Sequence, residues 1–331
     1  MNPALPRFLQ PLDHGIYAVD TGFHRDLFDA AYLMVHEGRA AFIDTGTNFA
    51  VPRLLASLQA LGLAPEAVEF VIPTHVHLDH AGGAGLLMQH LPNATLWVHP
   101  RGARHMVDPT ALWQGALAVY GVEEMQRSYG ELVAVPAHRV MPTGDGLRLY
   151  LAGRELFFAD TPGHARHHHC IWDATSRGWF TGDTFGLSYR DFDTARGPWI
   201  MPTSTPVQFD PSALASSIKR LMSFDPACMY LTHYGRVEDV PRLAELLQVQ
   251  LAQMVALGQH LQQRFQQAPG RHEALKNGLL DIYRHSLHEH GCRFTDSTLK
   301  QLLSIDLELN AQGMAVWLDA AAKAATQQVP A

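Results

Sequence analysis

Short apolar runs separated by turn residues fill the first two thirds of the chain. Three of them, at 16–19, 31–35 and 40–43, are bounded by polar or glycine-containing turns and predict strands. Residues 51–61 follow, with a proline in the first turn and a glycine just past the end, and predict a helix. We expect further strands at 70–72, 95–98, 147–151, 155–159, 170–172, 179–181 and 229–231, and helices from about 83 and over 212–222.

The pattern changes after residue 237. From Val240 to Phe265, apolar residues recur every three or four positions, which predicts one long amphipathic helix. Ala268-Pro269-Gly270 should end it, and further helices are expected at about 272–288, 296–309 and 313–325. The chain therefore predicts two domains, one of mixed strands and helices over 1–237 and a helical extension over 238–331 that packs on the first domain or mediates a homodimer.

The composition of the 331-residue chain limits the classes of function. Hydrophobic residues make up 47% and charged residues 17%, which is typical of a globular protein. The net charge of -7 and the absence of a basic run argue against a nucleic-acid partner. The chain has no apolar stretch long enough for a membrane span or signal peptide and only three cysteines. We expect a cytoplasmic protein that acts on a small-molecule substrate.

Histidine is the most informative component. The chain has 20 histidines against 25 Lys plus Arg, and many stand beside aspartate, a ligand mixture that suits zinc, iron or manganese better than calcium. The densest cluster is Thr74–His80, directly after a buried strand. Alternate residues of an extended segment point the same way, so His75 and His77 can share one ion. Asp79 and His80 must diverge, which suits a turn that leads to a second ion.

Three further ligand-type residues follow predicted strands. They are His164 in Asp160–His164, Asp183 in Thr181–Thr184 and His233 in Leu231–Gly235. Each alone is more often a hydrogen-bonded turn residue. Their shared position after strands, together with the first cluster, predicts a site with two metal ions.

These segments resemble the metallo-β-lactamase superfamily of hydrolases. The resemblance covers about residues 14–237, includes Ile43–Gly46, and is nearest to glyoxalase-II-like and lactonase-like members. It implies a four-layer αββα sandwich with strand ends converging on the metals, and a structural role for Asp44 beside them. The ligands that it implies are His75, His77 and His164 for one ion, Asp79, His80 and His233 for the other, and Asp183 as the bridge.

The expected reaction follows from the chemistry of two divalent ions, zinc first, with iron or manganese as alternatives. Such a pair can hold a bridging hydroxide near neutral pH and stabilise an oxygen that becomes negative. This favours hydrolysis of a small lactone, thioester or phosphoester, with Asp183 bridging the ions and Asp79 as ligand or also as proton shuttle. A di-iron protein that responds to oxygen or redox state, on the same ligands, is the alternative.

Substrate contacts are expected from loops around the metals. The long aromatic connection 185–209 contains Tyr189 and Trp199, which could line the substrate site or simply anchor a surface loop. His24, in an early turn, is a further candidate. His168 stands four positions after His164, where related hydrolases often have a histidine, and the neighbouring His167 and His169 have no predicted role.

Overall fold

The computed structural model describes residues 5–265 and 270–327, which divide into two compact units. This division differs from the single boundary predicted at residue 237, because two internal segments group with the C-terminal helices. The first unit comprises Met1–Thr161, His167–Gly182 and Ser223–Val240, and the second comprises Pro162–Arg166, Asp183–Met222 and Pro241–Ala331.

The first unit contains two mixed β-sheets. The seven-stranded sheet has the order β1-β2-β3-β4-β5-β6-β7, antiparallel up to β4 and parallel from β4 to β7. The predicted early strands are confirmed, and the short strands β1 and β7 were not predicted. The bounds are β1 Leu9–Pro11, β2 Ile16–Asp20, β3 Ala30–His36, β4 Arg39–Ile43, β5 Val68–Ile72, β6 Thr95–Val98 and β7 Val140–Pro142.

The second sheet has six strands in the order β13-β12-β11-β10-β9-β8. Only the β11–β12 pair is parallel, and the predicted hairpin forms the antiparallel pair β8–β9. The bounds are β8 Arg148–Leu151, β9 Arg154–Asp160, β10 His169–Asp173, β11 Gly178–Gly182, β12 Cys228–Leu231 and β13 Gly235–Val237.

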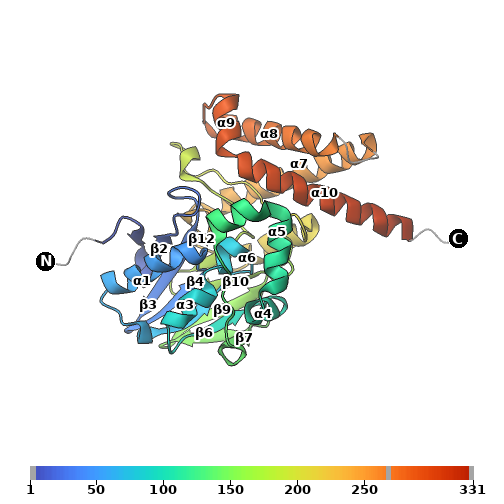
Figure 1. Cartoon of the computed structure of the whole chain (residues 1–331). Helices are drawn as coiled ribbons and strands as arrows, with labels where there is room; N and C mark the ends of the chain where they lie inside the picture. The colour runs from blue at the N-terminus through green and yellow to red at the C-terminus, as the bar shows by residue number, and fades with distance from the viewer. Residues whose placement is uncertain (1–4, 266–269, 328–331) are drawn as a thin grey trace. The chain divides into compact units, whose positions relative to one another are not determined.

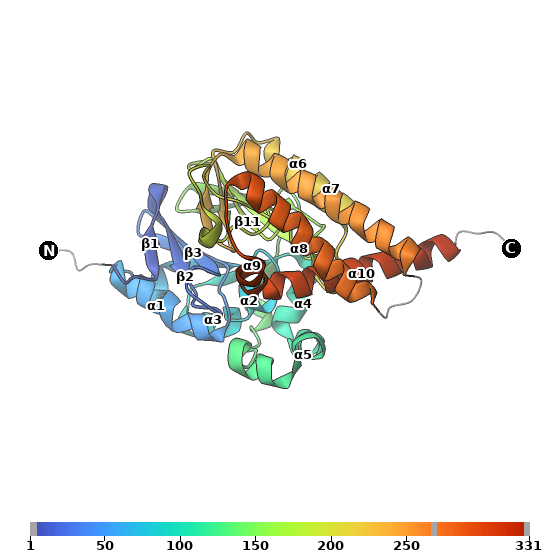
Figure 2. The same cartoon turned by 90° about the horizontal axis from the view of Figure 1, so that it is seen from above.

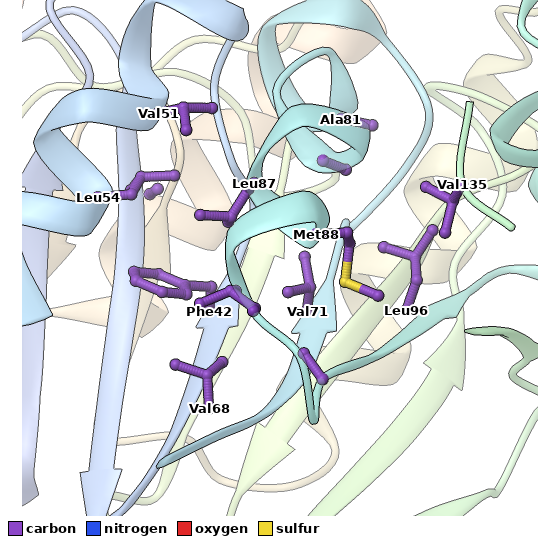
Figure 3. Close-up of a cluster of buried hydrophobic side chains, with 14 of the residues drawn as sticks. Phe42, Val51, Leu54, Val68, Val71, Ala81, Leu87, Met88, Leu96 and Val135 are labelled. Carbon is purple, nitrogen blue, oxygen red and sulfur yellow. The ribbon is translucent and has the colours of Figure 1, made fainter. Parts of the chain in front are cut away.

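Alternate strand residues enter two separate apolar cores. In β3, Leu33 belongs to the core under the helices and Tyr32 to the core between the sheets, as the period of two requires. Figure 3 shows the first core, where Leu54 of α1 and Leu87 of α3 point toward Phe42 on β4. Two mixed sheets with flanking helices confirm the predicted sandwich class.

Helices of the first unit cover the seven-stranded sheet or extend from it. The predicted helix at 51–61 is α1, Val51–Ala60, with a proline in its first turn, and the helix expected from about 83 is α3, Ala84–His90. A one-turn helix, α2, spans Leu78–Ala81. Two helices that the sequence did not predict are α4, Pro100–Val107, and α5, Thr110–Glu124.

The second unit consists of helices and the long aromatic connection. Helix α6, Pro211–Met222, is capped as predicted, because the Asp210 side chain accepts hydrogen bonds from the backbone N–H groups of Ser212 and Ala213. Helices α7, α8 and α10 lie side by side in both views (Figure 1, Figure 2). The bounds are α7 Val240–Arg264, α8 Arg271–His290, α9 Asp296–Leu302 and α10 Ser304–Gln327.

Buried polar contacts join the connection to these helices. The Tyr189 hydroxyl donates to Asp306 of α10 at 2.9 Å, and the Trp199 indole N–H donates to Ser286 of α8 at 2.9 Å. The Gln250 amide of α7 donates to the Ile200 carbonyl at 2.7 Å. These contacts explain why residues 183–222 group with the C-terminal helices.

One predicted helix break is wrong. We expected separate helices at 296–309 and 313–325, but the break is at Leu303, and α10 runs through Gly313. A Cβ at Gly313 would lie 2.4 Å from the Ser204 Oγ atom. The glycine therefore permits close packing of α10 against the connection, where the sequence pattern alone indicated a helix end. The predicted break at Ala268–Gly270 lies, apart from Gly270, outside the described residues.

None of the helices in the described ranges combines the length and the apolar character that crossing a bilayer requires.

A buried ion pair joins β9 to β10. The Arg154 guanidinium makes two hydrogen bonds to the Asp173 carboxylate, at 2.9 and 2.5 Å, and donates to the His14 carbonyl at 2.6 Å. Both side chains are almost fully buried. Burial would raise the pKa of Asp173, but hydrogen bonds from Arg154 and Ser176 lower it. Removal of one partner would leave an uncompensated buried charge.

We therefore expect Asp173→Ala to lower the free energy of unfolding by about 3–5 kcal/mol, measured by urea denaturation. The control is Asp281→Ala on α8, which breaks the exposed Arg284–Asp281 pair and should cost less than about 1 kcal/mol. Equal effects of the two substitutions would show that burial of the Arg154–Asp173 pair does not make its loss more costly.

Asp29 is a second buried carboxyl group, just before β3. One oxygen accepts a hydrogen bond from the Thr21 hydroxyl at 3.1 Å, and the other, Oδ1, has no hydrogen-bond partner among the described residues. Burial raises the pKa of Asp29 to about 8, against the opposing effect of the nearby imidazoles of His233 and His80. The folded protein thus retains a proton that the unfolded chain loses near pH 4.

This pKa predicts a pH-dependent stability. Between about pH 4 and about pH 8 the folded state binds more protons, so the free energy of unfolding should fall as pH rises, by at most about 1.4 kcal/mol per pH unit. Asp29→Asn removes the titrating carboxyl group. The difference in the free energy of unfolding between wild type and variant should therefore shrink or reverse toward alkaline pH. Both proteins are unfolded in urea from about pH 5 to about pH 9 after chelator treatment. If the free energy of unfolding depends on pH in the same way in both proteins, a raised pKa of Asp29 is excluded.

Candidate metal centre

The histidine-rich segment 74–80 follows β5 and enters α2. His75 and His77 lie before the helix, with His77 as its N-terminal cap residue, and their Nε2 and Nδ1 atoms are 2.7 Å apart. His75 is fully buried. As predicted from the alternation of an extended segment, the two imidazoles face each other, and both nitrogens can reach a single cation.

A second group forms around Asp79. Its Oδ2 atom lies 3.4 Å from Nε2 of His233, which follows β12, and 3.8 Å from Nε2 of His80. The three ligand atoms lie within 4.8 Å of one another. His80 is fully buried, whereas the Asp79 side chain is 24% exposed, so the group opens to solvent at its carboxylate.

The remaining nitrogen of each imidazole is bound by the protein. His80 Nδ1 donates to the Asp44 carboxylate at 2.9 Å, and His233 Nδ1 donates to the Phe28 carbonyl at 2.9 Å. Metal-binding histidines commonly use their second nitrogen in this way, which directs the lone pair of the first toward the ion. Two such imidazoles and one carboxylate are a donor set that fits a divalent transition metal.

Asp44 is the centre of this hydrogen-bond network. It follows β4 with a left-handed backbone, φ +57°, which aspartate tolerates better than most residues. Besides His80, its carboxylate accepts from the Thr74 backbone N–H at 2.6 Å and from the Thr232 hydroxyl at 2.7 Å. It thus braces the segments that carry His75, His80 and His233, which is the structural role that the resemblance implied.

The charge of Asp79 is stabilised by its neighbours. Burial would raise the pKa of its carboxyl group, but His80 and a hydrogen bond with His233 hold that pKa well below its usual value. Asp79 is therefore ionised and available as an anionic ligand.

His164 and Asp183 belong to the second unit. Their side chains approach each other, with His164 Nε2 3.3 Å from Asp183 Oδ2. The Thr203 carbonyl lies 3.4 Å from His164 Nδ1, and the Thr205 hydroxyl donates to the His164 carbonyl. Backbone contacts with the start of α6 fix the same turn, since a Cβ on Gly163, φ +135°, would lie 2.3 Å from backbone atoms of Leu214.

Peptide bonds connect this pair to the first unit. Asp183 directly follows Gly182, the last residue of β11, where a Cβ would lie 2.5 Å from the Thr74 hydroxyl. His164 stands in the five-residue segment before His167, whose ring centroid lies 5.4 Å from that of His77. Both ligand candidates are thus attached to chain positions that border the 74–80 segment.

His168 and His169, which follow His167 directly, have separate environments. His168 is fully buried, stacks on His75 with ring centroids 4.7 Å apart, and pairs with the Thr161 hydroxyl at 3.0 Å. This position supports His75, and a contact of His168 with substrate stays a prediction. His169 donates to the Pro73 carbonyl at 2.9 Å, and burial lowers its pKa to about 3.

The other predicted substrate residues differ in exposure. Tyr189 and Trp199 are buried and hydrogen-bonded within the second unit, which accounts for both by packing, so their contact with substrate stays a prediction without support from exposure. His24 is exposed, and its ring lies 5.5 Å from that of Phe28. Burial of part of its ring lowers the pKa of His24, although carboxylates nearby oppose this shift.

Sequence reasoning missed two groups that support the candidate ligands, and one buried carboxyl group next to them. Thr232 directly precedes His233 in the segment Leu231–Gly235. The sequence therefore contained a signal for its role, because that segment was already predicted to carry a ligand. The Phe28 carbonyl has no such signal, because a backbone acceptor can belong to any residue. Asp29, which follows it, was missed because one aspartate in a turn resembles many others.

Known proteins with similar sequences support the same fold. The chain is 26% identical over 218 residues to the metallo-beta-lactamase fold-containing protein ST1585 of Sulfurisphaera tokodaii, a match that covers 65% of this chain and 75% of that protein. The solved structure of ST1585, described as an archaeal metallo-beta-lactamase superfamily protein from Sulfolobus tokodaii, superposes with a TM-score of 0.64 at 20% identity and covers 92% of this chain and 99% of that one.

A second relative is a hydroxyacylglutathione hydrolase of Xanthomonas axonopodis pv. citri, 32% identical over 160 residues. The match covers 47% of each protein, so this chain spans about half the length of that relative. The sequence model of the metallo-beta-lactamase superfamily matches residues 25–233, more than half of the chain and the range that holds all seven candidate ligands. This protein therefore belongs to the metallo-beta-lactamase superfamily.

Proposed function

We propose that this protein is a binuclear metal-dependent hydrolase that acts on a small ester-type substrate, a lactone, thioester or phosphoester. The orientation of His80 and His233 carries the proposal. Both donate through Nδ1 to protein acceptors, which leaves Nε2 beside the Asp79 carboxylate. Two imidazoles oriented in this way suit the binding of a cation better than hydrogen bonding alone.

The proposed ligand sets follow the two groups of side chains. His75, His77 and His164 would hold one ion, and Asp79, His80 and His233 the other, with Asp183 shared between them. The 2.7 Å approach of His75 and His77 and the 4.8 Å span of the Asp79 group support two separate positions. The attachment of His164 and Asp183 next to the 74–80 segment supports their inclusion.

Two divalent ions would supply hydroxide near neutral pH and a positive charge that polarises the substrate carbonyl or phosphoryl group; we expect zinc first, with iron or manganese as alternatives. The chain's own contribution is orientation and proton transfer. Asp79 is the partly exposed member of its group, so its carboxylate is placed to relay a proton to the leaving group, but its lowered pKa makes the role of anionic ligand the stronger one. His80 and His233 would use their Nε2 lone pairs on the metal, which leaves them no site for this proton.

The hydroxyacylglutathione hydrolase relative supports the hydrolase class, but the match spans too little of either protein to name a substrate. The alternative is a di-iron protein that responds to oxygen or redox state. A solved structure entitled a peroxy diiron species of a chemotaxis sensor has the same fold at 15% identity, which is a likeness of fold alone. Metal analysis and optical spectra, combined with a panel of lactones, thioesters and phosphoesters, separate the two. Redox-active iron without hydrolysis would favour the alternative.

Asp183→Ala tests the shared ligand. We expect turnover to fall by at least about a thousandfold and bound metal to fall below two ions per chain, because a bridging carboxylate contributes to both positions. Activity on the best substrate and metal content by plasma emission are measured on the same sample.

The matched control is Asp191→Ala, an exposed aspartate of the same unit, which should keep both values. Full activity and full metal content in Asp183→Ala would remove the bridging assignment.

Asp44→Asn tests the orientation of His80. The amide cannot accept from all the donors that surround the carboxylate, so we expect metal affinity to fall by about 10–100-fold. Competition with a chelating dye measures the affinity, and circular dichroism verifies that the variant is folded. Unchanged affinity in a folded variant would show that His80 does not depend on Asp44.

A further inference from the structure

Asn310 is a buried polar residue inside α10. It is 1% exposed, although asparagine is a weak helix former that mostly lies at the surface. Its Oδ1 atom accepts a hydrogen bond from the Ser204 backbone N–H at 2.6 Å. Its Nδ2 atom donates to the Pro202 carbonyl at 3.4 Å and to the Tyr283 hydroxyl of α8 at 2.9 Å. Asn310 thus holds the backbone on both sides of Thr203, in the long aromatic connection.

The peptide group between Thr203 and Ser204 links this side chain to His164. Its N–H donates to Asn310, and its carbonyl oxygen lies 3.4 Å from Nδ1 of His164, within hydrogen-bonding distance. Because a carbonyl can only accept, the imidazole donates through Nδ1. A peptide group is planar, so the direction that Asn310 gives to its N–H also sets the direction of its C=O. Hydrogen bonds in such a chain polarise and strengthen one another.

Further contacts fix the same segment. The Thr205 hydroxyl donates to the His164 carbonyl at 3.2 Å, and the Ser204 hydroxyl donates to the Asn310 carbonyl at 3.1 Å. These four residues are buried, so solvent competes little for their hydrogen bonds. Gly313 lies three residues after Asn310 on the same face of α10, and a Cβ there would lie 2.4 Å from Ser204 Oγ and 2.5 Å from the Thr205 carbonyl oxygen. Helix α10 therefore packs an amide and a glycine against the segment that holds His164.

We propose that Asn310 is a positioning residue for His164, so that α10 belongs to the metal centre. The inference rests on the proposed function, which assigns His164 to one of two ions. The hydrogen bond at Nδ1 leaves Nε2 of His164 directed toward Asp183, whose Oδ2 atom lies 3.3 Å away.

Positioning explains the asparagine better than packing does. An apolar side chain would fill the same space at a lower cost of burial. A metal ligand, in contrast, has to stay within about 0.5 Å of its working position, and hydrogen bonds behind the ligand supply that precision.

The experiment titrates chelator-treated protein with zinc alone, in competition with a chelating dye, and resolves the affinity of each ion. The first test variant is Asn310→Leu, which keeps most of the side-chain volume but cannot accept from the Ser204 N–H. We expect one ion to bind about tenfold more weakly, the lower end of the effect of groups behind a metal ligand. The other ion should keep its affinity, because His164 is not among its ligands.

The second test variant is Gly313→Ala, which removes no hydrogen bond. Its Cβ would displace Ser204 and Thr205, and we expect the same weakening of one ion. Alanine favours a helix over glycine, so this variant should fold even where Asn310→Leu does not.

Two control variants change the same unit elsewhere. Ser286→Ala removes the buried hydrogen bond between the Trp199 indole and α8. Gly258→Ala adds a methyl group to α7, where the nearest atoms belong to the side chains of Trp317 and Met314, at 3.1 and 3.2 Å. Both controls should keep both zinc affinities, and circular dichroism verifies that each variant is folded.

Two results would overturn the inference. One is unchanged zinc affinity in the folded test variants. The other is an equal loss of both ions in test and control variants, which would indicate a general loosening of the unit.

Failure of the proposed function gives a different result. If the wild type binds two zinc ions but hydrolyses no ester, the titration still decides the inference, because it needs no substrate. If the wild type binds no zinc, crystal structures of the metal-free proteins decide it. Nε2 of His164 should then move by more than about 0.5 Å in the test variants and stay in place in the controls. An imidazole that keeps its position in every variant would reject the inference.

Discussion

The carboxylate of Asp44 is the group on which the candidate metal centre depends. An isolated buried carboxylate is costly, and here backbone and side-chain donors from two other segments compensate it. Asp44 follows β4 in one sheet, whereas Thr232 follows β12 in the other. The same charge therefore joins the ends of both sheets and orients His80. The orientation of His80 is thus tied to satisfying this one buried carboxylate.

The parts that sequence could predict are those determined by local patterns. Strand β3 alternates between two cores, and helix α1 begins at a proline and ends before a glycine, so a short window contains the whole signal. The segment 74–80 is similar, because the spacing of its ligands restricts where each can point. Its pairings, His75 with His77 and Asp79 with His80, were predictable without knowing the rest of the fold.

Features that depend on distant neighbours were not predictable. Gly313 has the appearance of a helix end in sequence, but it lies inside α10 because Ser204 approaches its backbone. The connection 185–209 was assigned to the catalytic domain by its order along the chain, whereas its buried aromatic residues bond to α8 and α10. The Phe28 carbonyl that holds His233 has no side-chain signature at all. In each case the deciding contact is with a residue many positions away.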